Sequence, residues 1–274
     1  MASLLPPTVL GVLGEGRQAY VAVASTRGPH VTPELYAWSG DRLWFAAASS
    51  TLKAKVLRRD PSLGAVVNVA GRSVILTGTV EVFDPRNPLA VLGRLPQLPG
   101  VARALTSFTT RNAADLLAFL GDTASGRLGH RLPPVRLLFA LSPERIALVE
   151  NDALVGHWGW SVRPDTEDDP VPVGGERAVA AFPGPVALPV RWFAERSRLH
   201  LARPLTGLLE RSAVRGRFPI SVVVDDYTAP GPAAKRGALM RGEGRAIGGD
   251  LCEIEVEAER IVEWDGTETT SGAA

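Results

Sequence analysis

The feature that most constrains the fold of this chain is a repeat of its first half in its second half. Four short segments recur in the same order: Gly28-Pro29-His30-Val31-Thr32-Pro33 as Gly184-Pro185-Val186-Ala187-Leu188-Pro189, Leu43-Trp44-Phe45 as Leu199-His200-Leu201, Thr77-Gly78 as Arg241-Gly242, and Pro143-Glu144-Arg145-Ile146 as Ala258-Glu259-Arg260-Ile261. Repeated segments in a constant order indicate an internal duplication. Two copies are the number expected of a fused dimer whose halves pack about a pseudo-two-fold axis.

Within the first copy, apolar runs of strand length are separated by tight-turn signals. The expected strands are 19–24, 30–37, 43–47, 64–69, 74–83, 135–140 and 146–149. Residues from about 85 to 131 have a helical period and are expected to form an inserted helical segment. Short strands joined by tight turns predict a small antiparallel barrel. The sequence thus predicts a mainly β protein with inserted helices.

The domain boundary is expected in the acidic, Pro- and Gly-rich stretch 161–176. Such composition is typical of linkers between domains. We therefore expect a first barrel over residues 1–160, which carries the helical insert. A second, degenerate barrel is expected over residues 177–274, packed against the first as an intramolecular pseudo-dimer.

The stretch Leu43–Pro61 has the pattern of a phosphate site. A short apolar strand runs through small and hydroxyl residues into a basic helix, which Ser50 or Thr51 would cap. Free backbone N–H groups and the positive end of the helix dipole favour an anion at such a turn. Lys53 and Lys55 add to this, because the chain has 30 basic residues but only one other lysine, Lys235. The alternative is a surface helix with solvated charges.

Composition narrows the classes of function. The formal net charge is +1, which gives no electrostatic reason to expect nucleic acid or an anionic membrane as a partner. No apolar run is long enough for a membrane helix and no signal peptide is recognisable, so a soluble, cytoplasmic protein is expected. The four histidines lack metal-ligand spacing, so no metal site is expected. No nucleophile–base pair stands out, and the sequence assigns no catalytic residue.

The residues from AYVAVASTRGPHVTPELYAWSGDRLWFAAASSTLKAKVLRRDPSLGAVVNV to VILTGTVEV, together with 135–150, resemble the FMN-binding split β-barrel superfamily. This superfamily includes pyridoxamine 5′-phosphate oxidase-like proteins and relatives that bind the deazaflavin F420 or haem. The resemblance implies two tandem split β-barrels, with a cofactor between subunits. It further implies that Ser49, Ser50, Thr51 and Lys53, with Lys55 beside them, hold the phosphate and ribityl chain. The strand Val31, Thr32 and Pro33 would follow the ring system.

The second copy is expected to lack its own phosphate site. Counting at the spacing of the Gly-Pro repeat, Lys53 falls on Leu209 and Lys55 on Arg211. A buried phosphate would lack its main counter-charge there. The second copy is instead expected to lend a wall to the first site, through Arg191, Trp192 or Arg203, although core packing is the alternative for Trp192. His30 would contact a ring or ligate haem, or be a hydrogen-bonded structural histidine.

Two functions follow from these expectations. The first is an oxidoreductase that uses FMN, or alternatively F420, for hydride transfer with a small organic substrate. The second is a non-catalytic barrel that binds a flavin or haem. In either case the expected partners are small molecules, and the pseudo-dimer within one chain would be a monomer or would form a homodimer.

Overall fold

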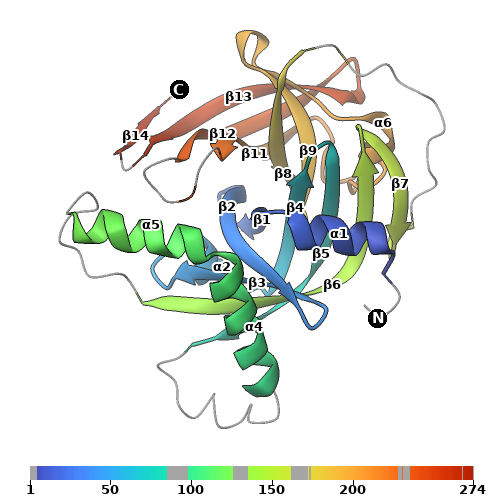
Figure 1. The fold of residues 1–274 in the computed structure, drawn as a ribbon. Coiled ribbons are helices and arrows are strands. Elements are labelled where there is room, and N and C mark those ends of the chain that lie inside the picture. The colour runs from blue at the N-terminus through green and yellow to red at the C-terminus, as the bar shows by residue number, and fades with distance from the viewer. Residues whose placement is uncertain are drawn as a thin grey trace.

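The computed structural model describes residues 5–84, 98–125, 135–161, 174–227, 235–266 and 268–273, together with Pro172 and Pro230. The described residues of its first half form seven strands and four helices, which Figure 1 labels. Their bounds are α1 Pro7–Glu15, β1 Gln18–Ser25, β2 Gly28–Ser39, β3 Arg42–Ala48, α2 Leu52–Leu57, β4 Ser62–Val69, β5 Arg72–Phe83, α4 Leu98–Arg111, α5 Ala113–Ala124, β6 Arg136–Glu150 and β7 Ala153–Trp158.

The strands of the first half form one antiparallel sheet in the order β3-β2-β1-β4-β5-β6-β7. An additional pairing of β3 with β6 closes six of these strands into a barrel, and β7 is added at the edge. The inward-facing residues are apolar, as alternation along half-buried strands requires. Phe45 and Phe139 stack inside it with their ring centroids 5.0 Å apart.

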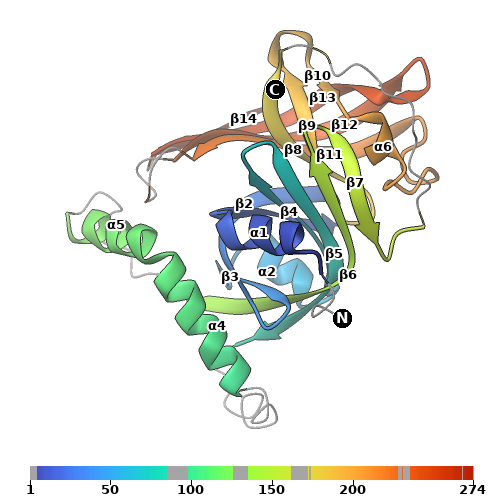
Figure 2. The same cartoon turned by 45° about the vertical axis from the view of Figure 1, so that its right-hand side comes forward.

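Helix α1, which the sequence analysis did not predict, closes one end of this barrel. Figure 2 shows α1 within the outline of the barrel strands. Val9, Val12 and Leu13 on α1 are fully buried. These positions have the i, i+3, i+4 spacing of an amphipathic helix, and Pro7 is the first helical residue, so a sequence signal was present.

The second half repeats this arrangement strand for strand. Its sheet has the order β10-β9-β8-β11-β12-β13-β14, and the pairing of β10 with β13 closes six strands into a second barrel. The prediction of two tandem barrels in a mainly β fold is confirmed. The bounds are β8 Glu176–Phe182, β9 Val186–Phe193, η3 Ala194–Arg196, β10 Arg198–His200, α6 Arg203–Thr206, β11 Arg217–Tyr227, β12 Lys235–Ile247, β13 Asp250–Asp265 and β14 Glu268–Ala273.

One irregularity is conserved between the two copies. In the first barrel the register shifts between Thr77 and Gly78, opposite Pro143–Arg145. In the second it shifts between Arg241 and Gly242, opposite Ala258–Arg260. These are the residues that the sequence repeat paired, so a shared β-bulge supports that part of the alignment. The bulge also keeps β6 continuous through Pro143, where the sequence analysis expected a break between two strands.

The repeat alignment is wrong by two residues at β3. Tyr36 and Trp192 correspond at the spacing of the Gly-Pro segment. Tyr36 pairs with Phe45, whereas Trp192 pairs with Leu199. Phe45 therefore corresponds to Leu199, and not to Leu201, because the hairpin between the two strands is two residues shorter in the second copy.

The turn after β3 also differs between the copies. In the first copy, Ser49-Ser50-Thr51 separates β3 from α2, whereas only Leu201-Ala202 separates β10 from α6. When the two helices are aligned by their first residues, Lys53 corresponds to Pro204 and not to Leu209. Corresponding residues found by counting a constant spacing are wrong beyond a turn whose length differs between the two copies. The expectation that the second copy lacks the lysine is unaffected.

The two barrels pack through a shared apolar core. Ala22, Val31 and Val66 of the first barrel belong to the same buried cluster as Phe182 and Val222 of the second. A hairpin end of each barrel also packs against a strand of the other. Gly28 lies against Pro219 of β11, and Gly64 of β4 lies against Pro185. A side chain at Gly64 would collide with the backbone of Pro185, so glycine is required by the close approach there.

The described part of the helical insert consists of α4 and α5. Helix α4 packs on the outside of the first barrel, where Ala104 contacts Trp44 and Ala140. The remainder of the insert, at 85–97 and 126–134, lies outside the described residues, as does most of the predicted linker, residues 162–171 and 173. Cys252 is a free, buried cysteine on β13.

Candidate functional site

The turn between β3 and α2 is built as the sequence predicts, but its hydroxyl groups are not all available. Thr51 caps α2, because its hydroxyl oxygen accepts a hydrogen bond from the backbone N–H of Ala54 at 3.4 Å. The same hydroxyl donates to the carbonyl of Ala48 at 2.8 Å. Ser49 is half-buried and its backbone N–H donates to the carbonyl of Val135, whereas Ser50 is exposed. Thr51 thus stabilises the helix, and only the two serines leave side chains for another role.

Lys53 points into the protein. It is only 5% exposed and forms an ion pair with Glu34 on β2. Burial, together with the nearby charge of Arg136, lowers the pKa of Lys53 to about 7. Lys55 lies on the opposite, exposed side of α2, because residues two apart on a helix face different ways. The two lysines that the sequence analysis placed together therefore do not converge.

The face of β2 that meets Lys53 carries His30, Thr32 and Glu34, which alternate along the strand and so share one side. The Nδ1 atom of His30 and the hydroxyl of Thr32 are buried and have no hydrogen-bond partner among the described residues. Burial lowers the pKa of His30 to about 4, and the charges of Lys53 and Arg241 act in the same direction.

The other two β2 residues of the predicted ring-binding strand point away from Lys53. Val31 faces the opposite side of the strand, where it is fully buried in the core shared by the two barrels. Pro33 is half-buried and lies opposite Tyr20 on β1. Of the three, only Thr32 is on the side that faces Lys53, because alternate residues of a strand point in opposite directions.

The second barrel contributes cations to the same region through β12. Arg241 donates a hydrogen bond to the carbonyl of Arg27 at 3.2 Å, across the junction of the two barrels. Lys235 is half-buried, and burial lowers its pKa, as does Arg136, while Asp115 and Asp225 act in the opposite direction. Arg136 therefore acts on a lysine of each barrel. The term Lys53 cluster denotes the following residues: His30, Thr32, Glu34, Lys53 and Arg136 of the first barrel, with Lys235 and Arg241 of the second.

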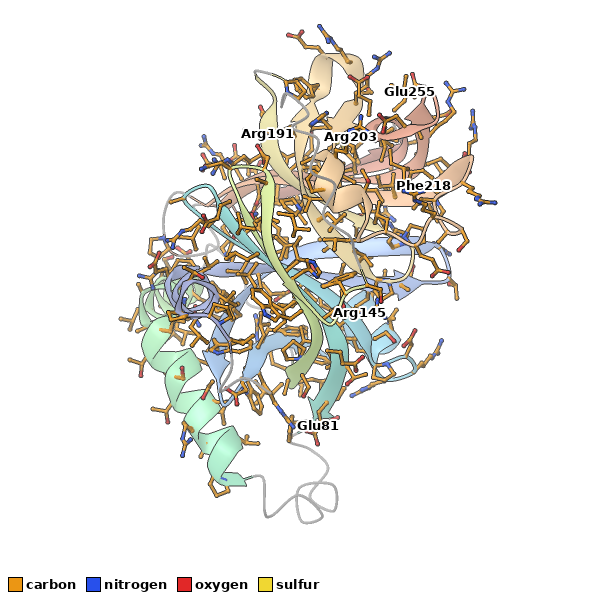
Figure 3. The ribbon with its side chains drawn as sticks, turned by 90° about the vertical axis from the view of Figure 1, so that its right-hand side faces the viewer. Glu81, Arg145, Arg191, Arg203, Phe218 and Glu255 are labelled. Atoms are coloured by element: carbon orange, nitrogen blue, oxygen red, sulfur yellow. The ribbon has the colours of Figure 1, made fainter. Side chains whose placement is uncertain are left out.

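Trp192 and Arg203, which the sequence analysis expected at the cofactor site, are not part of the Lys53 cluster. Trp192 is 6% exposed and packs in the core of the second barrel, so the core-packing alternative describes it correctly. Arg203 begins α6 and pairs with Asp250 at 2.9 Å, while Arg191 pairs with Asp152 at 3.0 Å. Figure 3 shows Arg191 and Arg203 within the second barrel. By the internal symmetry, α6 is the counterpart of α2, so Arg203 belongs to the opposite side of the pseudo-dimer.

Four members of the cluster were missed from the sequence, namely Glu34, Arg136, Lys235 and Arg241. They are far apart in the chain, and no motif joins them. Only the barrel closure and the packing of the two copies bring them together.

The composition of the Lys53 cluster fits an anionic ligand with several hydrogen-bonding groups. Burial lowers the pKa values of both Lys53 and Lys235, although Glu34 contacts the Lys53 ammonium. A phosphate or carboxylate beside Lys53 would favour its charged form. The unpaired His30 Nδ1 and Thr32 hydroxyl would accept further polar contacts. Among the described residues there is no group of three or more side chains suited to a metal ion, and no helix long and apolar enough to cross a membrane.

No protein-family model and no curated protein matches the chain. Among solved structures, the chain is similar to a FAD-binding protein from Mesorhizobium loti, with 18% identity, coverage of 53% of this chain and 94% of that one, and a TM-score of 0.36. It is also similar to a pyridoxamine 5′-phosphate oxidase-related, FMN-binding protein from Nostoc punctiforme, with 15% identity, coverage of 53% and 86%, and a TM-score of 0.39. An F420 reductase matches with 16% identity, coverage of 52% and 98%, and a TM-score of 0.34.

The topology is the stronger observation. Two closed six-stranded antiparallel barrels, each with one added strand, are joined in one chain and share a core. In fold, the chain is a tandem of two antiparallel split barrels.

Proposed function

We propose that the chain binds one flavin-type cofactor, FMN or F420, at the Lys53 cluster, and that it is an oxidoreductase acting on a small organic substrate. The observation that carries the proposal is the buried ammonium of Lys53, which lies on the side of β2 where the His30 Nδ1 atom and the Thr32 hydroxyl have no hydrogen-bond partner among the described residues. The bound cofactor would supply hydride transfer. The chain's own residues would bind, orient and shield it.

In this proposal Lys53 and Arg136 hold the anionic end, with Ser49 and Ser50 at the adjacent turn. Thr51 keeps α2 in place as its cap. Thr32 and His30 offer hydrogen-bonding atoms along β2, and Arg241 closes the site from the second barrel. Glu34 holds Lys53 when no ligand is present, so a phosphate must compete with a carboxylate already in contact with the ammonium.

The test is a fluorescence titration of the full chain with FMN and with F420. We expect Lys53→Met to weaken binding tenfold or more, since a hydrogen bond to a charged group is worth about 1.5–3 kcal/mol. Lys55→Met is the matched control, because Lys55 is on the same helix but exposed, and it should change affinity less than twofold. Glu34→Gln should tighten binding severalfold, because it removes the internal competitor.

Lys53→Met leaves the half-buried Glu34 without its partner, which would lower stability, and breaking a fully buried pair costs about 3–5 kcal/mol. The double variant Lys53→Met/Glu34→Gln avoids this, and should be folded but unable to bind. If Glu34→Gln lowers stability and leaves affinity unchanged, the ion pair is purely structural and the assignment of the site is wrong. If cofactor binds and no substrate is reduced or oxidised, the non-catalytic alternative is correct.

A further inference from the structure

The mouth of the second barrel is a wide, mostly apolar cavity. Its volume is about 1,020 Å³. The apolar residues around it come from β9, β11, β12 and β13, and they include Trp192, Val224, Met240, Val256, Ile261 and Trp264. This cavity is separate from the Lys53 cluster, none of whose residues lines it.

The same place in the first barrel is filled by α1. Register equates the lining residues with first-barrel residues of the core that contains Val9, Val12 and Leu13 of α1. The pairs are Tyr36 with Trp192, Val67 with Val224, Leu76 with Met240, Leu141 with Val256, and Ile146 with Ile261. Tyr36, Val67 and Leu76 have no exposed surface. Of their counterparts and neighbours in the second barrel, Val224 and Ile261 are half-buried, while Trp192, Met240 and Val256 are 6%, 8% and 4% exposed. The two barrels thus have equivalent apolar mouths, and α1 covers the mouth of the first barrel.

The polar anchors of α1 are also repeated. Arg72 pairs with Glu15 at the end of α1, with 2.8 Å between the guanidinium and carboxylate. Its counterpart is Arg236, because Arg72 lies opposite Val69 and Glu150, and Arg236 lies opposite Asp226 and Asp265. Arg236 pairs with Asp265 at 2.8 Å, so a carboxylate of a bound helix must compete with Asp265 for the guanidinium. The Tyr36 hydroxyl donates to the carbonyl of Leu13 at 2.8 Å. Trp192 places a ring with one N–H donor at the same position.

The second copy does not encode a helix like α1. The segment before β8 is acidic and contains Pro164, Pro170 and Pro172. It has no apolar residues at the spacing of Val9, Val12 and Leu13, and proline within a helix removes a hydrogen bond and clashes with the preceding turn. The mouth of the second barrel therefore keeps its apolar walls and Arg236, but the sequence before β8 does not encode a helix to cover it.

We propose that the mouth of the second barrel binds a short apolar helix from a partner protein, with a carboxylate near the helix C-terminus that reaches Arg236. The partner helix lies as α1 lies in the first barrel, with residues at i, i+3 and i+4 on Trp192, Met240 and Ile261. This is recognition of an amphipathic helix by an apolar groove. Helix α1 of the same chain shows how such a helix packs on an equivalent barrel mouth.

The probe is a synthetic peptide with the sequence of residues 5–16. A covalent staple joins positions 10 and 14, because Leu10 is 39% exposed and a side chain at Gly14 would meet nothing within 4 Å. Calorimetry with the full chain should show saturable binding at one peptide per chain. Ala238→Phe, which fills the mouth without adding charge, and Met240→Asp should each weaken binding at least tenfold, with circular dichroism showing that the variants remain folded.

A double-mutant cycle tests the anchor. The peptide carrying Glu15→Gln, and the protein variant Arg236→Gln, should each weaken binding about two- to fivefold, as expected of an exposed ion pair, and the combination should weaken it no further. Arg217→Gln is the control, because Arg217 pairs with Glu243 and Glu257 outside the mouth.

Three results would overturn the proposal. One is the absence of saturable binding up to millimolar peptide. Another is binding that persists in both Ala238→Phe and Met240→Asp. The third is saturation by dodecanoate with no binding of the peptide, which would make the mouth a small-molecule site.

Discussion

His30 is held neutral by its surroundings. It is mostly buried on β2, and burial with the charges of Lys53 and Arg241 lowers its pKa to about 4. In the unfolded chain a histidine titrates near pH 6.5. Between these values the unfolded chain binds a proton that the folded protein does not, so the unfolding free energy must fall as the pH decreases.

The expected contribution of His30 to this fall is about 2–3 kcal/mol between pH 6.5 and 4, from at most about 1.4 kcal/mol for each pH unit. Urea unfolding of the protein and of His30→Gln over pH 4–8 isolates it. The difference between the two should be constant above pH 7 and should shrink in favour of the variant toward pH 4. Parallel curves throughout would mean that the pKa of His30 is the same in the folded protein as in the unfolded chain.

Helix α1 shows what a single element contributes. Its inner face fills the first barrel, and its outer face includes Gly14, at which a Cβ would meet nothing within 4 Å. Gly14→Ala should therefore stabilise the protein by about 0.5–1 kcal/mol, since alanine loses less backbone freedom than glycine in a helix. Gly16, just beyond the helix, is the matched control. Its Cβ would collide with Val67 and the Tyr36 hydroxyl, so Gly16→Ala should be destabilising. Thermal unfolding of both variants measures the difference, and a shift of the same sign in both would contradict the seating of α1.

At the scale of the whole molecule, the two duplicated barrels differ in their helices, in the turn after the third strand and in the lysine that follows it. The first has α1, the Ser49–Thr51 turn and Lys53. The second has a shorter turn, and Pro204 stands where Lys53 would be. A loss of two hydroxyl donors and one charged donor costs several kcal/mol, which moves a micromolar site beyond millimolar.

Calorimetric titration with FMN or F420 should accordingly saturate near one ligand per chain. The double variant Lys53→Met/Glu34→Gln should then bind none, which shows that the single site is the Lys53 cluster. Saturation at two ligands per chain would mean that the second copy retains a site despite its shorter turn. Retention of one ligand in the double variant would place the site elsewhere.

The barrels were predictable from sequence because their signals are local. Alternating apolar runs and tight turns locate most of the strands, and Thr51 is recognisable as a helix cap from its neighbours. The duplication was also visible, and the bulge at Thr77-Gly78 and Arg241-Gly242 shows that the alignment was correct there. It failed across the β2–β3 hairpin and the following turn, where the two copies differ in length. Helix α1 was missed although its spacing of apolar residues was present.

The sequence by itself determined two mainly β halves, their equivalence, and the presence of Lys53 in one half alone. Only the tertiary structure decided where Lys53 points, that Glu34 is its partner, and that Lys55 is apart from it. It also decided that Arg241 of the second barrel lies near His30, whereas Trp192 packs in the core and Arg203 pairs with Asp250. The physical reason is that strand and turn preferences act over a few residues. The direction of a side chain and its charged neighbours depend on barrel closure and on packing between residues far apart in the chain.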